Sequence, residues 1–187
     1  VLILTGLAVG AILSAGISFL SLLDTDVLAS YQAFSVGSLA AVLEESLVMP
    51  LVLIALSFVA SLFLSPTLDL LRLGDAMATH LGVRVRAVRL VSMLLASAAA
   101  AAAVSFAGLL GFVGLMAPHI SAYFVGAKLC RRLPAAALCG ALLVVGADFI
   151  GRLAFAPGEM PVGVLMSLFG APFFLFLLFR KGGETNA

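Results

Sequence analysis

Charge is what this sequence has least of. Of its 187 residues, 10 are Lys or Arg and 9 are Asp or Glu, so charged residues make up 10%, against about 25% in an ordinary soluble domain. A soluble protein of this size covers its surface with polar and charged groups, and these side chains are too few to do so. Apolar residues make up 64% of the chain, and its mean hydropathy is +1.28. The composition predicts an integral membrane protein.

Several chemistries are missing as well. A net charge of +1 gives nucleic-acid binding no electrostatic support, so we expect no nucleic-acid partner. Two cysteines, Cys130 and Cys139, are too few for a disulfide framework or a metal site. Neither Lys128 nor Lys181 stands in the Gly-x-x-x-x-Gly-Lys context of a phosphate-binding loop. We therefore expect no metal, no cofactor and no ATP hydrolysis or other catalysis by this chain itself.

Long apolar runs predict where the chain crosses a bilayer. A hydrocarbon core about 30 Å thick needs about 20 apolar residues of helix, and the uncharged run from Leu90 to Ala127 is long enough for two crossings. We predict six transmembrane helices, at 1–22, 47–66, 88–107, 109–127, 134–153 and 162–179. The shorter, more polar segment 27–43 is interpreted as a short helix and turn at the membrane surface, a further crossing being the alternative. The predicted fold class is all-α, a polytopic transmembrane helical bundle.

Basic residues fall unevenly on the two sides of this topology. Nine of the ten lie on one side: Arg72, Arg84, Arg86, Arg89, Lys128, Arg131, Arg132, Arg180 and Lys181. The opposite side carries Asp24, Asp26, Glu44, Glu45 and Glu159, with Arg152 as its cation. The positive-inside rule therefore predicts that the basic side, with the C-terminus, is cytoplasmic.

The predicted cytoplasmic loop 67–87 contains a short helix of its own, the second short helix predicted besides the six crossings. After Gly74, the residues Asp75–Leu81 indicate a short helix with an acidic residue near its positive end, and Gly82 follows as its stop. Such a helix suits docking to a partner protein. The alternative is an interfacial helix that only anchors the bundle.

Small residues predict close packing in two places. Gly6, Gly10 and Ser14 form a stripe on the first helix, although glycine is also simply frequent in membrane helices. A second group recurs every three residues and either permits close helix contact or marks a non-helical turn. These residues are Gly108, Gly111 and Gly114.

Ionisable groups are nearly absent from the predicted helix interiors. Asp148 comes closest, and Arg152 follows on the same helical face, so we interpret the two as a local ion pair near the outer interface. A functional intramembrane carboxylate is the alternative. His80 and His119 are interpreted as loop and helix-packing histidines rather than ligands or proton relays. This scarcity argues against a self-contained ion pump and favours a passive conduit moved by something else.

Five sequence blocks occur in a recognisable order across most of residues 65–180. They are Gly74–Ala76 with Leu81–Val83, Gly111–Leu115 with Pro118–Ile120, Leu133–Pro134 leading to Ala147–Asp148, Glu159–Gly163, and Gly170–Phe174. Together they resemble the permease subunits of bacterial importers for iron–siderophore, haem and vitamin B12, the FecCD family of ABC transporters. The function that this resemblance implies is a permease that carries such a chelate, with a secondary transporter, an ATPase-independent channel or a purely structural subunit as the alternatives.

The resemblance also implies an architecture and partners. A ten-helix type II permease is expected, of which residues 1–187 would be the last six helices, as a single transmembrane domain. We accordingly interpret Val1, which has neither Met nor a basic segment before the apolar run, as lying inside a helix of a longer protein. The implied setting is the lipid bilayer of a bacterial cytoplasmic membrane. The implied partners are cytoplasmic ABC ATPase subunits, a second permease copy or a homologous permease, and a periplasmic or lipoprotein substrate-binding protein.

The candidate site residues fall into four groups, of which the resemblance implies the first three. The ATPase-coupling segment comprises Gly74, Asp75, Ala76, Ala78, His80, Leu81 and Gly82, with Asp75 where the family usually has Glu. Docking of the binding protein is assigned to Arg152 and Glu159. The pore and the permease–permease interface are assigned to Gly6, Gly10, Ser14, Gly170 and Pro172. Helix turning and packing are assigned to Gly108, Gly111, Gly114 and Pro118, and residues 24–46 are expected to form a periplasmic loop with a short gating helix.

Overall fold

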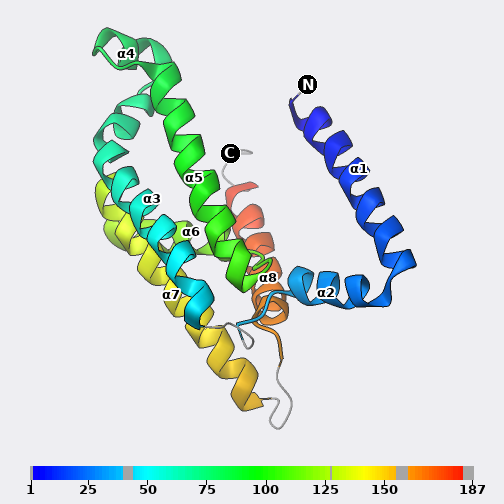
Figure 1. The fold of residues 1–187 in the computed structure, drawn as a ribbon. Coiled ribbons are helices and arrows are strands. Elements are labelled where there is room, and N and C mark those ends of the chain that lie inside the picture. Colours follow the sequence, from blue (N-terminus) through cyan, green and yellow to red (C-terminus); the bar gives the residue numbers. More distant parts are fainter. Residues whose placement is uncertain (1, 40–43, 127, 155–159, 183–187) are drawn as a thin grey trace.

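The structure, a computed structural model, describes residues 2–39, 44–126, 128–154 and 160–182 (Figure 1). Every regular element in these ranges is an α-helix. The helices are α1 (Leu2–Leu23), α2 (Thr25–Val36), α3 (Glu44–Leu71), α4 (Asp75–His80), α5 (Val85–Ala107), α6 (Val113–Val125), α7 (Leu129–Ala154) and α8 (Val162–Gly182). The predicted all-α fold class is confirmed.

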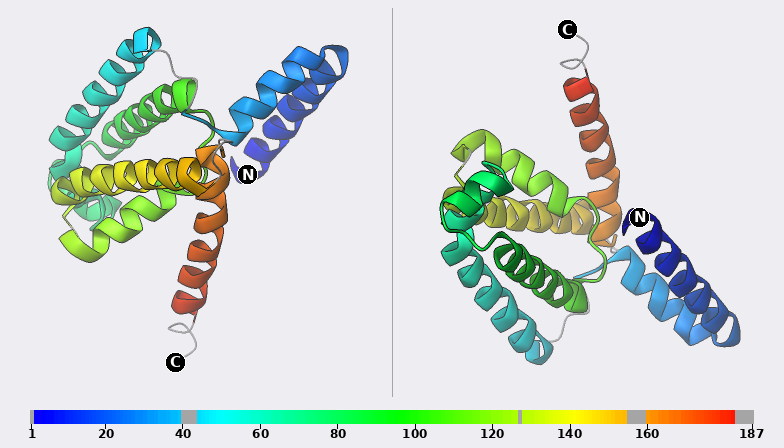
Figure 2. Two further views of the ribbon diagram at one scale, coloured as in Figure 1. Left: turned by 90° about the horizontal axis from the view of Figure 1, so that it is seen from below. Right: turned by 90° about the horizontal axis from the view of Figure 1, so that it is seen from above.

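Four of the helices form a bundle, and the others extend from it. α3 packs on α5, α6 packs on α7, and α3 also contacts α7. Figure 2 shows this group end-on, with α1 and α2 projecting from it in one direction and α8 in another. α2 lies crosswise between α1 and the bundle (Figure 1), as expected for a short surface helix in 27–43.

The six helices predicted to cross the membrane correspond to α1, α3, α5, α6, α7 and α8, with changed limits. Within the described residues, α1, α3, α5 and α7 are long and apolar enough to span a membrane, whereas α6 and the apolar part of α8, Val162–Leu177, are shorter. The prediction of a helix over 109–127 is wrong at its start, because residues 108–112 form a connection and α6 begins only at Val113. Phe112, which precedes α6, has φ 62°, and this left-handed conformation breaks the helical path.

Pro66 does not end its helix, contrary to the predicted boundary at 66. α3 continues through Pro66 to Leu71. Proline lacks the N–H that would bond to the carbonyl four residues earlier, here that of Leu62. The hydroxyl of Ser65, which is fully buried, donates to that carbonyl instead at 2.7 Å. The helix therefore passes the proline with its Leu62 carbonyl satisfied.

α7 likewise starts five residues before the predicted boundary at 134. The backbone N–H of Leu129 lies 3.1 Å from Oδ2 of Asp69, at the end of α3. A carboxylate at a helix N-terminus satisfies one of its free donors and stabilises it. This contact fixes the helix start ahead of Pro134, which α7 includes.

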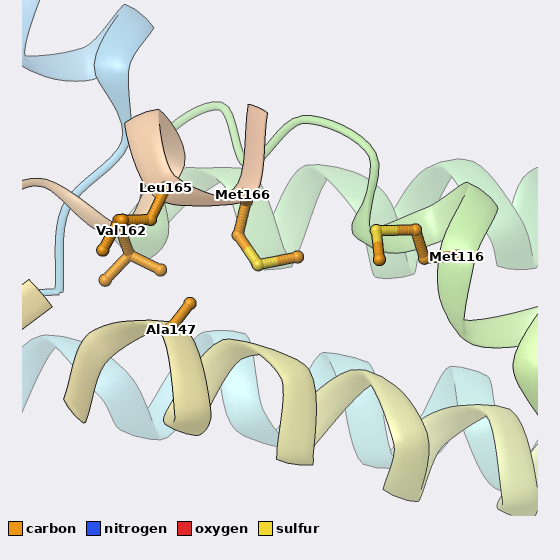
Figure 3. Close-up of a cluster of buried hydrophobic side chains, with 5 residues drawn as sticks. All are labelled: Met116, Ala147, Val162, Leu165 and Met166. Atoms are coloured by element: carbon orange, nitrogen blue, oxygen red, sulfur yellow. The ribbon is translucent and has the colours of Figure 1, made fainter. Parts of the chain in front are cut away.

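The molecule has little interior of its own. It exposes 13336 Å², whereas a soluble monomer of 19.2 kDa exposes about 8,400 Å². A buried cluster joins α6, α7 and α8 through Met116, Ala147, Val162, Leu165 and Met166. Figure 3 shows Val162 and Leu165 of α8 above Ala147 of α7, with Met166 extending toward the side of Met116. Most large apolar side chains elsewhere face outward, which fits a protein whose surroundings are apolar.

The described helices alternate between two ends of the molecule. One end carries α4, the C-terminal end of α8 and the connection from α6 to α7, and the nine basic residues of the predicted cytoplasmic side lie there. The other end carries α2, the connection from α5 to α6, and the C-terminal end of α7 (Figure 1), in whose last turn Arg152 lies. Basic residues are thus concentrated at one end, where Asp69 and Asp75 also lie.

Candidate functional site

The predicted coupling helix exists as α4, held between two glycines in the left-handed half of backbone space. Gly74 has φ 104° and Gly82 has φ 81°. The N–H of Gly82 donates to the carbonyl of Thr79 at 2.9 Å, and the N–H of Val83 donates to that of Ala78 at 3.0 Å. This pair of bonds is a Schellman motif, with Gly82 at the position that favours glycine. Gly82 is thus the stop predicted for this helix.

One buried residue and one ion pair hold α4 against the bundle. Ala78 is fully buried, and α4 contacts both α3 and α5. Asp75, the first residue of α4, pairs with Arg89 of α5, whose Nη2 lies 2.9 Å from Oδ1 and 3.1 Å from Oδ2. Because Arg89 lies one turn inside α5, the pair ties α4 to the start of a bundle helix.

The outer face of α4 is exposed and partly apolar. Met77 is 54% exposed, and Leu81, directly after the helix, is 56% exposed. Ala76, Thr79 and His80 are exposed beside them. A short, capped helix that presents apolar side chains among polar ones is a surface suited to a protein partner.

The Asp148–Arg152 pair is formed at the opposite end. Nε of Arg152 lies 2.9 Å from Oδ2 of Asp148, one turn earlier on α7. The Arg152 side chain is 50% exposed and that of Asp148 28% exposed. Arg152 therefore reaches the surface with its position set by Asp148. Glu159, assigned with Arg152 to docking, lies outside the described residues.

Some of the candidate pore and interface residues are exposed, and one is packed inside this chain. Gly6, Gly10 and Ser14 are exposed, and a Cβ at either glycine would meet nothing within 4 Å. Pro172 on α8 is also exposed, whereas Gly170 is buried where a Cβ would overlap the side chain of Phe112. The structure thus places Gly170 in the packing of this chain and leaves the α1 stripe open.

The glycines at 108, 111 and 114 have different roles. Gly108 and Gly111 lie in the connection between α5 and α6, which confirms the non-helical turn, and Gly114 lies in the first turn of α6 with open space around it. Gly108 also makes a close contact, because a Cβ there would lie 2.6 Å from the carbonyl oxygen of Phe34 in α2. Both alternatives left open by the sequence are therefore realised at Gly108.

Two further predicted packing groups lie in α6. The carbonyl of Pro118 accepts from Nη2 of Arg132 and from Oγ of Ser121, each at 3.1 Å. Nδ1 of His119 lies 3.2 Å from the carbonyl oxygen of Leu115 in the same helix. These contacts fit a helix-packing role for both residues.

Four structural residues were missed by the sequence reasoning. The pairing of Arg89 with Asp75 was not predicted, since Arg89 was noted only for its positive charge. The backbone contact of Gly163 was not predicted either, since Gly163 was noted only within the block Glu159–Gly163. Gly37, at φ 69° after α2, ends a polar segment and could have been identified as a helix stop. The positive φ of Phe112 could not have been predicted, because no sequence pattern around it indicates a left-handed conformation at a residue other than glycine.

The described residues contain no group of three His, Cys, Asp or Glu side chains close enough to hold a metal ion. Both cysteines are free, Cys130 exposed and Cys139 half-buried.

Known proteins match this chain along nearly its whole length. The hemin transport system permease HmuU of Yersinia pestis is 39% identical over 186 residues, which are 99% of this chain and 56% of that protein. The vitamin B12 import system permease BtuC of Vibrio cholerae is 36% identical over 182 residues, 96% of this chain and 54% of that protein. The chain spans about half the length of these curated relatives.

A solved structure shares the fold. An inward-facing conformation of a metal-chelate type ABC transporter has a TM-score of 0.88 to this chain at 34% identity, over 96% of this chain and 58% of that chain. The helical arrangement is thus that of an importer permease, as the resemblance implied. The sequence pattern of the FecCD transport family matches residues 1–180. The chain therefore belongs to the FecCD transport family.

Proposed function

We propose that this chain acts as the membrane-spanning permease of an ABC importer, which carries an iron–siderophore or a related chelate such as haem or vitamin B12 across a bacterial cytoplasmic membrane. The relatives are permeases of such systems. The observation that carries the proposal is α4, a capped and exposed helix at the basic end of the bundle. A separate ATPase supplies the energy through it.

The proposed coupling role of α4 rests on how the helix is attached to the bundle. Gly74 and Gly82 turn the chain sharply at both ends of the helix, and Ala78 and Asp75 hold it to the bundle. Met77 and Leu81 remain outside for a groove on the ATPase. A push on this helix is transmitted to α3 and α5, because α4 contacts both.

The mechanism is alternating access driven from outside the chain. Nucleotide-dependent closure of two ATPase subunits moves the two coupling helices of a permease pair and shifts the population between inward-open and outward-open states. The described helix interiors carry few ionisable side chains, so a large chelate crosses an apolar pathway that binds it weakly. This proposal places the basic end and the C-terminus in the cytoplasm.

Two further contacts complete the importer. Arg152, oriented by Asp148, is positioned to pair with a carboxylate of a periplasmic or lipoprotein substrate-binding protein, together with Glu159. Within the membrane, the open stripe of Gly6, Gly10 and Ser14 on α1 fits close approach of another helix at the pore or in a second permease. Gly170 and Pro172 on α8 belong to this same proposed region.

Reconstitution of the complete transporter in liposomes tests the proposal. We expect chelate uptake that requires the ATPase subunit, ATP and the binding protein. Met77→Glu places a charge on the exposed face of α4 and is expected to reduce co-purification of the ATPase, whereas the matched Met77→Leu retains it. Gly82→Pro, which cannot adopt φ 81°, is expected to lower substrate-stimulated ATP hydrolysis while the protein still inserts.

Two results contradict the proposal in different ways. Uptake that persists without an ATPase subunit indicates a secondary transporter or a channel. Equal co-purification of the ATPase with Met77→Glu and Met77→Leu indicates that α4 is not the docking surface.

A further inference from the structure

Three helices meet backbone to backbone at the end of the molecule opposite α4. The N–H of Leu109, just after α5, donates to the carbonyl of Phe34 in α2 at 3.0 Å. The N–H of Gly163, in the first turn of α8, donates to the carbonyl of Gly37, directly after α2, at 3.2 Å. The C-terminal end of α2 is thus bonded to both neighbouring helices. Residues 34–37, 108–109 and 163 are called the outer junction here.

Glycine is required at each contact of the outer junction. A Cβ at Gly108 would lie 2.6 Å from the carbonyl oxygen of Phe34 and 3.0 Å from the Cα of Gly37. A Cβ at Gly37 would lie 2.7 Å from the carbonyl oxygen of Leu109, and one at Gly163 would overlap the carbonyl of Val36. Real Cβ atoms do not approach other atoms so closely, so the three backbones touch only because these side chains are absent.

The outer junction is the main attachment of α2 to the bundle. No residue of α2 is buried, so no side-chain core holds the helix in place. α2 also contacts α1, but α1 is itself exposed along its length. The position of α2 is consequently determined by α5 and α8 through these backbone bonds.

α5 links the outer junction to the coupling helix. At its start, Arg89 pairs with Asp75 of α4, and at its end Gly108 and Leu109 contact α2. Its 23 residues extend over about 35 Å without an internal proline. A helix is stiff over this distance, so displacement at one end is felt at the other.

We propose that Gly37, Gly108 and Gly163 are positioning residues that lock α2 to α5 and α8, so that α2 moves together with α5 when the coupling helix is displaced. This inference rests on the proposed importer function. It assigns to α2 a motion that is imposed on it through its C-terminal end, rather than one set by side-chain contacts of its own.

Comparing alanine substitutions at two glycines separates the effect of the close contact from the effect of backbone strain. Gly108 has φ 69° and ψ −162°, and Gly126, after α6, has φ 77° and ψ −160°. A Cβ at Gly126 would meet nothing within 4 Å. Gly108→Ala and Gly126→Ala therefore impose the same unfavourable backbone conformation, and only the first also forces α2 away from α5.

Uptake per ATP hydrolysed by the reconstituted transporter is the measurement. Gly108→Ala is expected to lower this ratio about tenfold, while the ATPase remains bound and active, because overpacking displaces the backbone. Gly126→Ala is expected to stay near the wild-type ratio. Equal losses in the two variants would show that strain alone is responsible and would overturn the inference.

A cross-link tests the shared motion without disturbing the glycines. Phe34→Cys with Leu109→Cys, in a background where Cys130 and Cys139 are replaced by alanine, allows a short bifunctional thiosulfonate to join α2 and α5, since both positions are exposed. Undiminished uptake after cross-linking is expected if the helices move as one. Loss of uptake on cross-linking, restored by reduction, means that they must separate and overturns the inference. Absence of uptake in the wild-type transporter would instead count against the importer function itself.

Discussion

The ion pair between Asp75 and Arg89 gives the sharpest test of how α4 is held. We consider Asp75→Lys, Arg89→Glu and the double exchange that carries both changes. Each single change places two like charges where Nη2 and Oδ1 now lie 2.9 Å apart. The double exchange restores an attractive pair with its polarity reversed. If the pair positions α4, both single variants are expected to lose substrate-stimulated ATP hydrolysis and the double exchange to recover most of it.

The size of the effect on folding is small. The two side chains are 59% and 53% exposed, and pairs this exposed stabilise proteins by about 0.2–1 kcal/mol because water and salt screen them. At about 2–4 °C per kcal/mol for a domain of this size, the single variants should lower Tm by only a few degrees. A bias of about 1 kcal/mol is nevertheless a factor of about five in the population of the docking orientation. Coupling is therefore expected to fall several-fold in a protein that remains folded.

The assay is ATP hydrolysis with and without loaded binding protein, at low and high ionic strength, with Tm measured on the same samples. Higher salt should reduce the difference between wild type and the single variants, since it screens exposed charges. If substrate-stimulated ATP hydrolysis stays as low in the double exchange as in Asp75→Lys alone, the reasoning is refuted. That result would mean that the carboxylate acts directly on the ATPase and that Arg89 does not position it.

Three other substitutions test the remaining contacts. Arg152→Glu is expected to weaken binding of the substrate-binding protein, most strongly at low ionic strength; a binding titration across a salt series measures this, and unchanged affinity would exclude Arg152 from the docking surface. Gly170→Ala is expected to lower Tm by several degrees, because a Cβ there would lie 2.6 Å from Cγ of Phe112 and overpacking costs about 1–3 kcal/mol; an unchanged Tm would contradict the close packing. Ser65→Ala is expected to cost about 1 kcal/mol in thermal unfolding, since it leaves the carbonyl of Leu62 without its donor; a stability equal to wild type would show that another group serves that carbonyl.

Much of the architecture was predictable because its causes are local. Apolar runs give the long helices, and the short helix α4 follows from Gly74 and Gly82, whose backbone conformations few other residues adopt. The Asp148–Arg152 pair follows from helical spacing alone.

What could not be predicted depends on contacts between distant segments. α3 passes Pro66 because a neighbouring hydroxyl substitutes for the missing N–H, and α7 begins early because Asp69, sixty positions before Leu129, accepts its first N–H. Gly37 and Gly163 give no local sign that they meet. Helix content was therefore readable from composition and pattern, whereas the helix limits and the outer junction required the tertiary structure.

The scarcity of charge bears on how the proposed importer would be driven. Within the described residues, the ion pairs lie near the two ends of the bundle, and His119, in the middle of α6, bonds to a carbonyl of its own helix. In the proposed importer, displacement enters at α4 and reaches α2 through α5 and the backbone bonds of the outer junction. A side chain can change rotamer, whereas a main-chain contact at glycine has no side chain that could do so. In this proposal, the backbone contact at Gly108 and the ion pair of Asp75 serve one requirement, that a displacement at one end of α5 reaches the other.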